Sequence, residues 1–83
     1  MIARNPTKTE VDYLASIDGK TVFSIQVRDD KNFEFYVESL LYDPDEELEY
    51  WSQQMLPKPH IFATIADAKA EILAQYHSHF AAN

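Results

Sequence analysis

Apolar and polar residues alternate along the first part of the chain, which predicts a half-buried β-strand. From Glu10 onward the apolar positions recur at every second residue, as expected when one face of a strand is buried and the other meets water. On this pattern we expect Val11, Tyr13, Ala15 and Ile17 to face the core.

The only glycine of the chain, Gly19, marks a turn into a second strand over 21–27. Side-chain parity then chooses the length of the loop. A three-residue loop places Tyr13 opposite Phe23, whereas a two-residue loop would place it opposite Ser24 and mix the apolar faces. We therefore expect the three-residue loop, with the glycine at the positive φ that a G1 bulge requires.

A third apolar run, over 33–42, follows a polar connection and predicts a third antiparallel strand. If Val27 faces Phe33 across this connection, then Phe23 faces Val37, so that both pairs are apolar. The first three strands are thus expected to form a meander.

The next segment carries the signals of a helix start. Asp43 can cap the first turn, Pro44 suits the first helical position, and the acids that follow suit the positive end of the helix dipole. Leu48, Trp51 and Met55 recur at three- and four-residue intervals as an apolar stripe. A first helix is therefore predicted here, ending at the prolines beyond Met55.

Residues 60–63 are predicted to be extended, and they could add a short fourth strand. Thr64, with Asp67 three residues later, opens a second helix with capping-box spacing. The predicted class is α+β: a three-stranded antiparallel meander followed by two helices (β-β-β-α-(β)-α), with the C-terminal helix packed on the sheet. Residues 1–8 are expected to be a flexible N-terminal tail and 9–83 a single domain. The apolar face of the C-terminal helix is predicted to comprise Ile65, Ala68, Ile72, Leu73, Tyr76 and Phe80.

The charge of the chain is acidic and unevenly distributed. Fourteen acids against seven bases give a net charge of −7, which disfavours direct binding to nucleic acid or anionic membranes. Between Lys31 and Lys58 there is no lysine or arginine, although half of the acids lie there. The chain has no cysteine and no apolar run of the roughly 20 residues that cross a bilayer, and we expect no signal peptide at residues 1–6. We expect a cytoplasmic protein.

The sequence contains no recognisable catalytic or cofactor motif. A single glycine excludes a phosphate-binding loop and a dinucleotide fingerprint. His77 and His79 would project to different sides of a helix without a third ligand, and His79 is expected to touch the edge of the core. A calcium loop starting at Asp43 would need glycine and glutamate where Leu48 and Gln54 stand. We expect no enzyme, no catalytic residues, no cofactor and no metal site.

Tyrosines interspersed with carboxylates favour a protein interface, because aromatic side chains anchor a contact while charge steers association. The sequence therefore predicts an interaction module, an adaptor or inhibitor that binds a basic protein. A concrete case is an inhibitor of a nucleic-acid-binding protein, in which carboxylates occupy the sites of phosphates, as in phage-encoded anti-defence proteins. The predicted partner-binding residues are Glu34, Tyr36, Glu38, Tyr42, Glu46, Glu49 and Tyr50.

Several alternatives remain open at this point. The first helix could lie across the outer face of the sheet, or that face could form a homodimer or be buried permanently in an accessory subunit. A small-ligand or metal-responsive domain using the histidine-bearing C-terminus is a further alternative.

Overall fold

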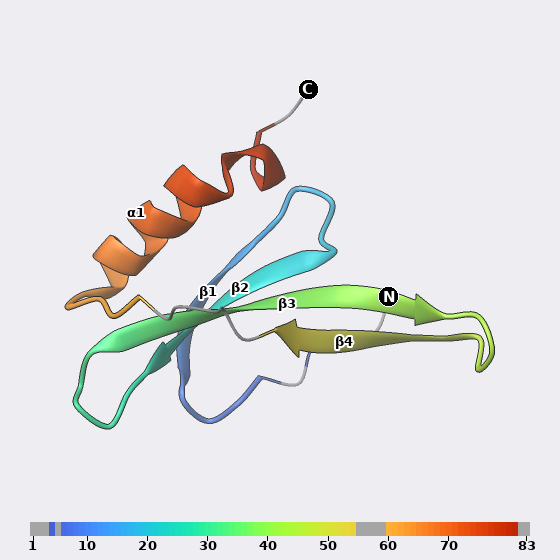
Figure 1. The fold of residues 1–83 in the computed structure, drawn as a ribbon, viewed down its shortest axis with the longest axis horizontal. Coiled ribbons are helices and arrows are strands. Elements are labelled where there is room, and N and C mark those ends of the chain that lie inside the picture. The colour runs from blue at the N-terminus through green and yellow to red at the C-terminus, as the bar shows by residue number, and fades with distance from the viewer. Residues whose placement is uncertain (1–3, 5, 55–59, 82–83) are drawn as a thin grey trace.

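The computed structural model describes residues 4, 6–54 and 60–81. Within these residues one four-stranded antiparallel sheet is packed on one side by an α-helix and a short 3₁₀ helix (Figure 1). The predicted α+β class is confirmed, but four strands and one α-helix replace the predicted three strands and two helices. The elements are β1 (Glu10–Ala15), β2 (Thr21–Val27), β3 (Phe33–Asp43), β4 (Leu48–Gln54), α1 (Ile65–Gln75) and η1 (His77–His79), with the strands in the order β1-β2-β3-β4.

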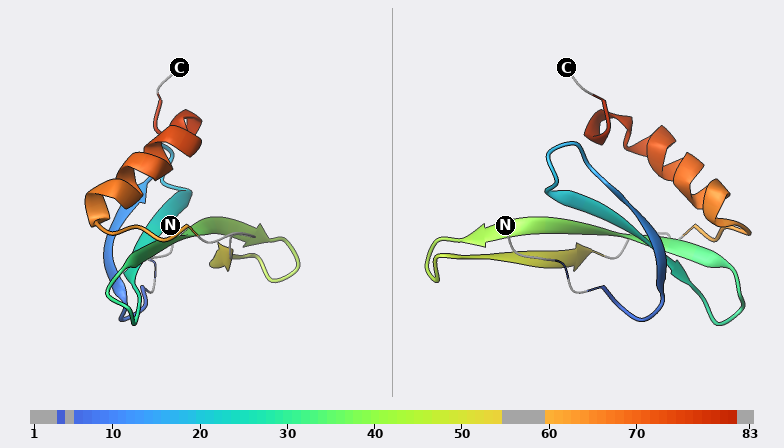
Figure 2. Two further views of the ribbon diagram at one scale, coloured as in Figure 1. Left: turned by 60° about the vertical axis from the view of Figure 1, so that its left-hand side comes forward. Right: turned by 180° about the vertical axis from the view of Figure 1, so that it is seen from behind.

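The hydrophobic core lies between α1 and one face of the sheet (Figure 2). Phe23 and Ile25 of β2 are fully buried against Ala68 and Ile72 of α1. Phe35 of β3 completes the core cluster. The prediction that the C-terminal helix packs on the meander is therefore confirmed.

The predicted pairing of β1 with β2 is wrong by one residue. Tyr13 pairs with Ser24 and Leu14 pairs with Phe23, which is the register that the shorter loop would give. As a result Val11 and Tyr13 are 47% and 52% exposed instead of facing the core. Ile17, at 61% exposed, is likewise outside it.

Polar contacts of the turn account for this register. Ser16 donates its hydroxyl to Asp18 and accepts the N–H of Thr21, which closes the hairpin around residues 17–20. Such side-chain bonds stabilise one loop over another independently of the faces that the strands present. Gly19 has a φ of 72°, so the predicted positive φ is confirmed. A bulge between Glu10 and Asp12 shifts the register once more at the start of β1.

The pairing of β2 with β3 follows the prediction. Val27 faces Phe33, and Phe23 faces Val37. The connection between them is closed by the N–H of Arg28, which donates to the carbonyl of Asn32 at 2.8 Å. Here the apolar faces and the loop favour the same register, so parity alone was sufficient.

The predicted first helix is wrong, because the segment forms a turn at 44–47 and returns as β4. Asp43 accepts the N–H groups of Asp45 and Glu46 at 3.0 and 3.4 Å, so its capping chemistry stabilises a turn rather than a helix end. Glu47 then takes a left-handed φ of 53° that redirects the chain along β3. Met55 and the prolines that were expected to end the helix lie outside the described residues.

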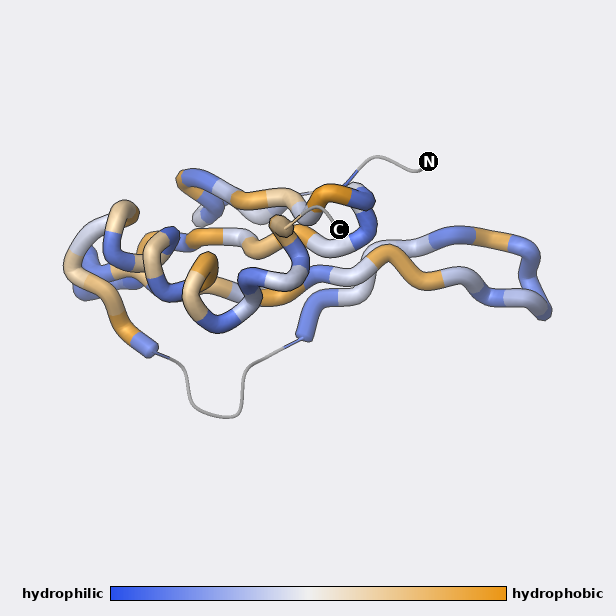
Figure 3. The backbone as a smooth tube through the Cα atoms, turned by 90° about the horizontal axis from the view of Figure 1, so that it is seen from above, coloured by the Kyte–Doolittle hydropathy of each residue, from blue (hydrophilic) through white to orange (hydrophobic). Residues whose placement is uncertain are grey.

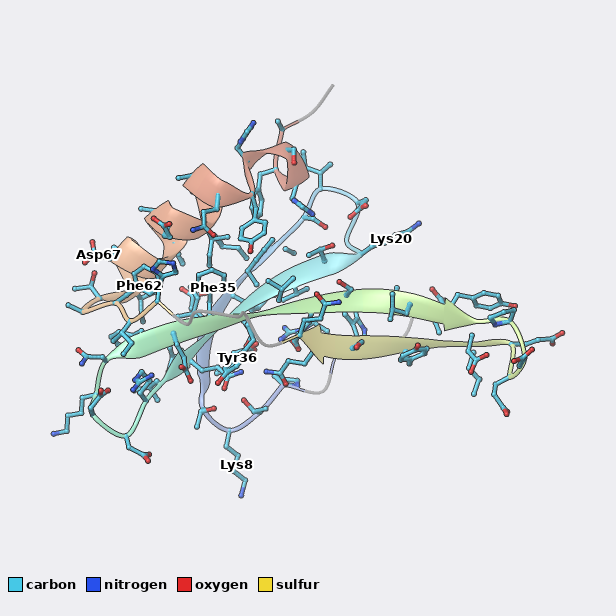
Figure 4. The ribbon with its side chains drawn as sticks, in the orientation of Figure 1. Lys8, Lys20, Phe35, Tyr36, Phe62 and Asp67 are labelled. Atoms are coloured by element: carbon cyan, nitrogen blue, oxygen red, sulfur yellow. The ribbon has the colours of Figure 1, made fainter. Side chains whose placement is uncertain are left out.

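The expected extended segment at 60–63 is present only as an isolated bridge. Phe62 exchanges two main-chain hydrogen bonds with Phe33, each 2.8 Å long. The Phe62 ring then packs 6.1 Å from that of Phe35, on the side of the sheet that α1 covers (Figure 4).

The predicted helix cap at Thr64 is confirmed. Its hydroxyl accepts the N–H of Asp67 at 3.1 Å. Ala68 and Ile72 of the predicted apolar face are buried, but Leu73 is 46% exposed, so the buried face of the helix is narrower than predicted. Ile65, Tyr76 and Phe80 pack against the core at its margins.

We expect Thr64→Ala to lower the free energy of unfolding by about 1 kcal/mol, since the N–H of Asp67 loses its acceptor. Urea denaturation followed by circular dichroism measures the change. Thr64→Ser keeps the hydroxyl and should retain most of the stability. Equal losses in the two variants would contradict the capping role.

Candidate functional site

The outer half of the β3–β4 hairpin projects beyond the part of the sheet that α1 covers (Figures 1 and 2). The residues of β3 that pack on the core end at Val37, although the strand continues to Asp43. We call residues 40–52 the arm. Because β4 runs back along this extension, the arm is a two-stranded ribbon that α1 does not cover (Figure 1).

The arm is acidic and also exposes large apolar side chains. Its tip is the most hydrophilic part of the ribbon, with apolar positions behind it (Figure 3). It contains no lysine or arginine, and a net-acidic surface of this kind attracts cationic groups. Its acids are Asp43, Asp45, Glu46, Glu47 and Glu49. Its exposed apolar residues are Leu41 (39%), Tyr42 (60%), Leu48 (57%) and Tyr50 (47%).

The register divides these side chains between two faces. Leu41 lies opposite Tyr50, on the same side of the sheet as α1. Tyr42 lies opposite Glu49, on the side without a helix. A partner could therefore contact an apolar face, a tyrosine–carboxylate face, or the tip.

The seven residues predicted to bind a partner do not form one surface. Tyr42, Glu46, Glu49 and Tyr50 belong to the arm, although Tyr50 is on the opposite face from Tyr42. The other three lie nearer the centre of the sheet, on its helix-free face, where Tyr36 is seen on the opposite side of β3 from Phe35 (Figure 4). These three are Glu34, Tyr36 and Glu38.

Glu38 is held in an internal ion-pair network. The Arg4 guanidinium binds Glu10 and lies 2.9 Å from Glu38, and all three side chains are at most 13% exposed. Glu10 also accepts the hydroxyl of the buried Ser24 at 2.5 Å. Sequence reasoning missed this network because it placed Arg4 in the tail. The flexibility predicted for residues 1–8 remains a prediction, since part of that segment lies outside the described residues.

Glu34 is also paired within the chain. It accepts the Tyr36 hydroxyl at 2.7 Å, and Arg28 approaches its other oxygen at 3.2 Å. The hydrogen bond to Glu34 raises the pKa of the Tyr36 hydroxyl, with burial adding to the effect. These residues border an open pocket of about 470 Å³, whose rim carries Arg28 together with acids. The mixed charge of that rim marks no single class of ligand.

We expect Glu34→Gln to move the pKa of Tyr36 down toward the ordinary tyrosine value. The folded-state pKa is raised, so the hydrogen bond stabilises the fold fully below the ordinary pKa and its contribution is lost as the pH rises through the folded value. Carbon NMR of the tyrosine Cζ atoms against pH measures this midpoint. Glu49→Gln is the matched control and should leave it unchanged. A midpoint unmoved by Glu34→Gln would contradict the assignment.

The histidines do not gather into a metal site. Within the part of the chain that the structure describes, no cluster of three or more histidine, cysteine or carboxylate side chains could hold an ion. The prediction that His79 touches the edge of the core is confirmed, because its ring lies edge-on to Phe23 with centroids 5.7 Å apart.

Comparison of the chain with family models, curated proteins and solved structures gave no match. Among the described residues, no helix is long and apolar enough to span a membrane. Any functional interpretation therefore depends on the geometry and charge of the surface itself.

Proposed function

We propose that the protein is an acidic interaction module, an adaptor or inhibitor, whose arm binds a basic surface of another protein. The observation that carries the proposal is the arm itself: a projecting ribbon with five acids, no base, and tyrosines and leucines exposed beside them.

The pairing of the other acids narrows the proposed site. Glu34 and Glu38 are already ion-paired with Arg28 and Arg4, so their carboxylates are less available to a partner. Acids of the arm have no described arginine or lysine bonded to them, because every described ion pair lies elsewhere. Their uncompensated charge would speed association, while Tyr42 and Tyr50 would supply apolar contact area.

The proposed partner is a protein with a cluster of lysines or arginines. A nucleic-acid-binding protein is the most specific case, since its phosphate sites are built from such clusters. Carboxylates on a projecting ribbon could enter a phosphate site and block it, which would make the protein an inhibitor of the anti-defence kind.

Charge reversal tests the proposal. Glu46→Lys/Glu49→Lys should weaken binding to a captured partner by at least about tenfold, because attractive contacts become repulsive. The matched control, Asp29→Lys/Glu71→Lys, changes the net charge equally but at positions outside the arm. Capture from lysate with both variants, across a salt series, gives the comparison.

Binding that depends on charge should also fall as salt rises, because salt screens exposed charges over roughly 10 Å at 0.1 M. Equal capture by the arm variant and the wild-type chain would overturn the proposal. Equal loss in both variants would show that only the overall charge matters, and would count against the arm as the site.

A second candidate function is self-association or assembly as an accessory subunit. The observation that favours it is the apolar face of the arm, where Leu41, Leu48 and Tyr50 are exposed together. This candidate predicts an oligomer in sedimentation experiments that persists at high salt and dissociates in Leu41→Asp.

A further inference from the structure

Main-chain hydrogen-bonding groups alternate in direction along each strand, so a few bonds fix the direction of all of them. Leu40 donates its N–H to the carbonyl of Lys20, at 2.8 Å. The main-chain N–H and C=O groups of the even-numbered residues of β3 therefore point toward β2. Phe33 is bonded instead to Phe62, on the opposite edge of β3. The main-chain groups of the odd-numbered residues of β3 therefore point toward β4.

The same alternation fixes the outer edge of β4. Leu41 faces Tyr50 and Ser39 faces Ser52, so the even-numbered residues of β4 are those that bond back to β3. The main-chain groups of Glu49 and Gln53 consequently point away from the sheet. Both residues are exposed, and β4 is the last strand of the sheet in the described part of the chain.

The two edges of the sheet differ in how they are protected. At the β1 edge a bulge interrupts the strand near Glu10, and just beyond its end the N–H of Ile17 is bonded to the carbonyl of His79 at 3.0 Å. β4 has seven residues in continuous register and contains no lysine, arginine or proline. Bulges, lysines and prolines are the usual devices that prevent an edge from accepting another strand. β4 lacks all three.

We infer that the partner binds by adding an extended basic segment as a fifth strand along β4. The inference rests on the proposed function and specifies the contact. Charge selects this occupant over a second copy of the chain, since two copies would each bring a net charge of −7 and an acidic arm to the same edge.

The pleat of β4 also determines the pattern of the added strand. Glu49 and Gln53 lie on one face, where a lysine or arginine opposite Glu49 would form a favourable cross-strand pair. Leu48 and Tyr50 lie on the other face, where an apolar side chain would be matched. The segment recognised is therefore one in which basic and apolar residues alternate.

The probe for this test is a short peptide of alternating lysine and valine, measured by isothermal titration calorimetry. A peptide of alternating lysine and proline has the same charge and length but is a poor strand, because the proline ring locks φ at about −65° whereas antiparallel strands need about −140°. We expect the wild-type chain to bind the lysine–valine peptide at least about tenfold more tightly than the lysine–proline peptide.

A variant of the chain tests the same contact from the other side. Gln53→Pro removes one outward N–H, a change that an edge strand tolerates when this group faces solvent. It should weaken binding of the lysine–valine peptide by about tenfold, whereas Gln53→Thr, which keeps the N–H, should not. The peptide comparison decides the matter if Gln53→Pro fails to fold.

The outcomes separate the inference from the proposed function. Equal binding of the two peptides, lost in Glu46→Lys/Glu49→Lys, would overturn strand addition while leaving an acidic binding arm. No binding of either peptide would count against both. Dimerisation of the free chain that is abolished by Gln53→Pro would make a second copy the occupant and overturn the inference.

Discussion

Replacing Phe23 by alanine is expected to lower the free energy of unfolding by about 3–5 kcal/mol, the usual cost of emptying a buried aromatic site. Phe23 is fully buried, with its ring centroid 4.8 Å from that of Tyr76 and 5.5 Å from that of Phe80. It therefore joins β2 to the C-terminal elements. Native domains are stable by only roughly 5–15 kcal/mol, so this loss is a large fraction of the total stability.

The matched control for Phe23→Ala is Tyr13→Ala. In the register with a three-residue loop, Tyr13 would sit opposite Phe23 in the core; in the structure it is 52% exposed and lies near the Arg4 guanidinium. Its loss should cost at most about 1 kcal/mol, the worth of an exposed cation–π contact. Urea denaturation of both variants gives the comparison, and similar losses would contradict the observed register of β1.

Arg4→Ala is expected to destabilise the fold by about 2–4 kcal/mol, because it leaves the Glu10 and Glu38 carboxylates without their cation. Both side chains are shielded from water, at 9% and 13% exposed, so solvent can replace the guanidinium only in part. Arg28→Ala breaks a more exposed pair, which solvent screens, and should therefore cost clearly less than Arg4→Ala.

Removing Arg4 has two effects: Glu10 and Glu38 lose their cation, and the packing around the side chain is lost. Second-site substitutions that restore stability separate these two effects. Arg4→Met fills much of the same volume without charge, and adding Glu10→Gln and Glu38→Gln removes the two stranded charges. The triple variant should therefore regain most of the stability that Arg4→Met alone loses. A stability of Arg4→Ala within about 0.5 kcal/mol of the wild-type value would show that the network contributes nothing measurable.

The parts of the fold that could be predicted are those where several local signals agree. Between β2 and β3, side-chain parity and the polar connection favour one register, and Val27 faces Phe33 as expected. Thr64 caps α1 as expected, because the hydroxyl of a residue at this position can accept the N–H three residues later, that of Asp67. Gly19 takes the positive φ expected of it, which a residue without a side chain adopts at no steric cost.

The predictions that failed concern segments whose structure depends on the strand with which they pair. An aspartate that binds two following N–H groups can begin a helix or close a turn, and Asp43 does the second because the extended end of β3 offers an edge to pair with. The spacing of Leu48 and Trp51 fits a helix, but their segment also contains the aromatic residues that strands favour. Only the long-range pairing decides between them.

The candidate site shows the same division. The base-free acidic stretch was visible in the sequence, and the arm lies within it. The ion pair of Glu38 could not be predicted from the sequence, because its partner, Arg4, lies 34 residues away along the chain. Ion pairs of this kind come from the tertiary fold, so the free acids could be told from the paired ones only in the structure.

The most direct test of the acidic arm is zero-length cross-linking of the bound partner with a carbodiimide, which joins a carboxylate to an amine that already touches it. Peptide mapping by mass spectrometry then identifies the carboxylates that were paired with lysines. We expect the cross-links at Asp45, Glu46, Glu47 and Glu49 of the arm. Cross-links confined to acids elsewhere, such as Asp29, Asp67 or Glu71, would contradict the arm as the binding site.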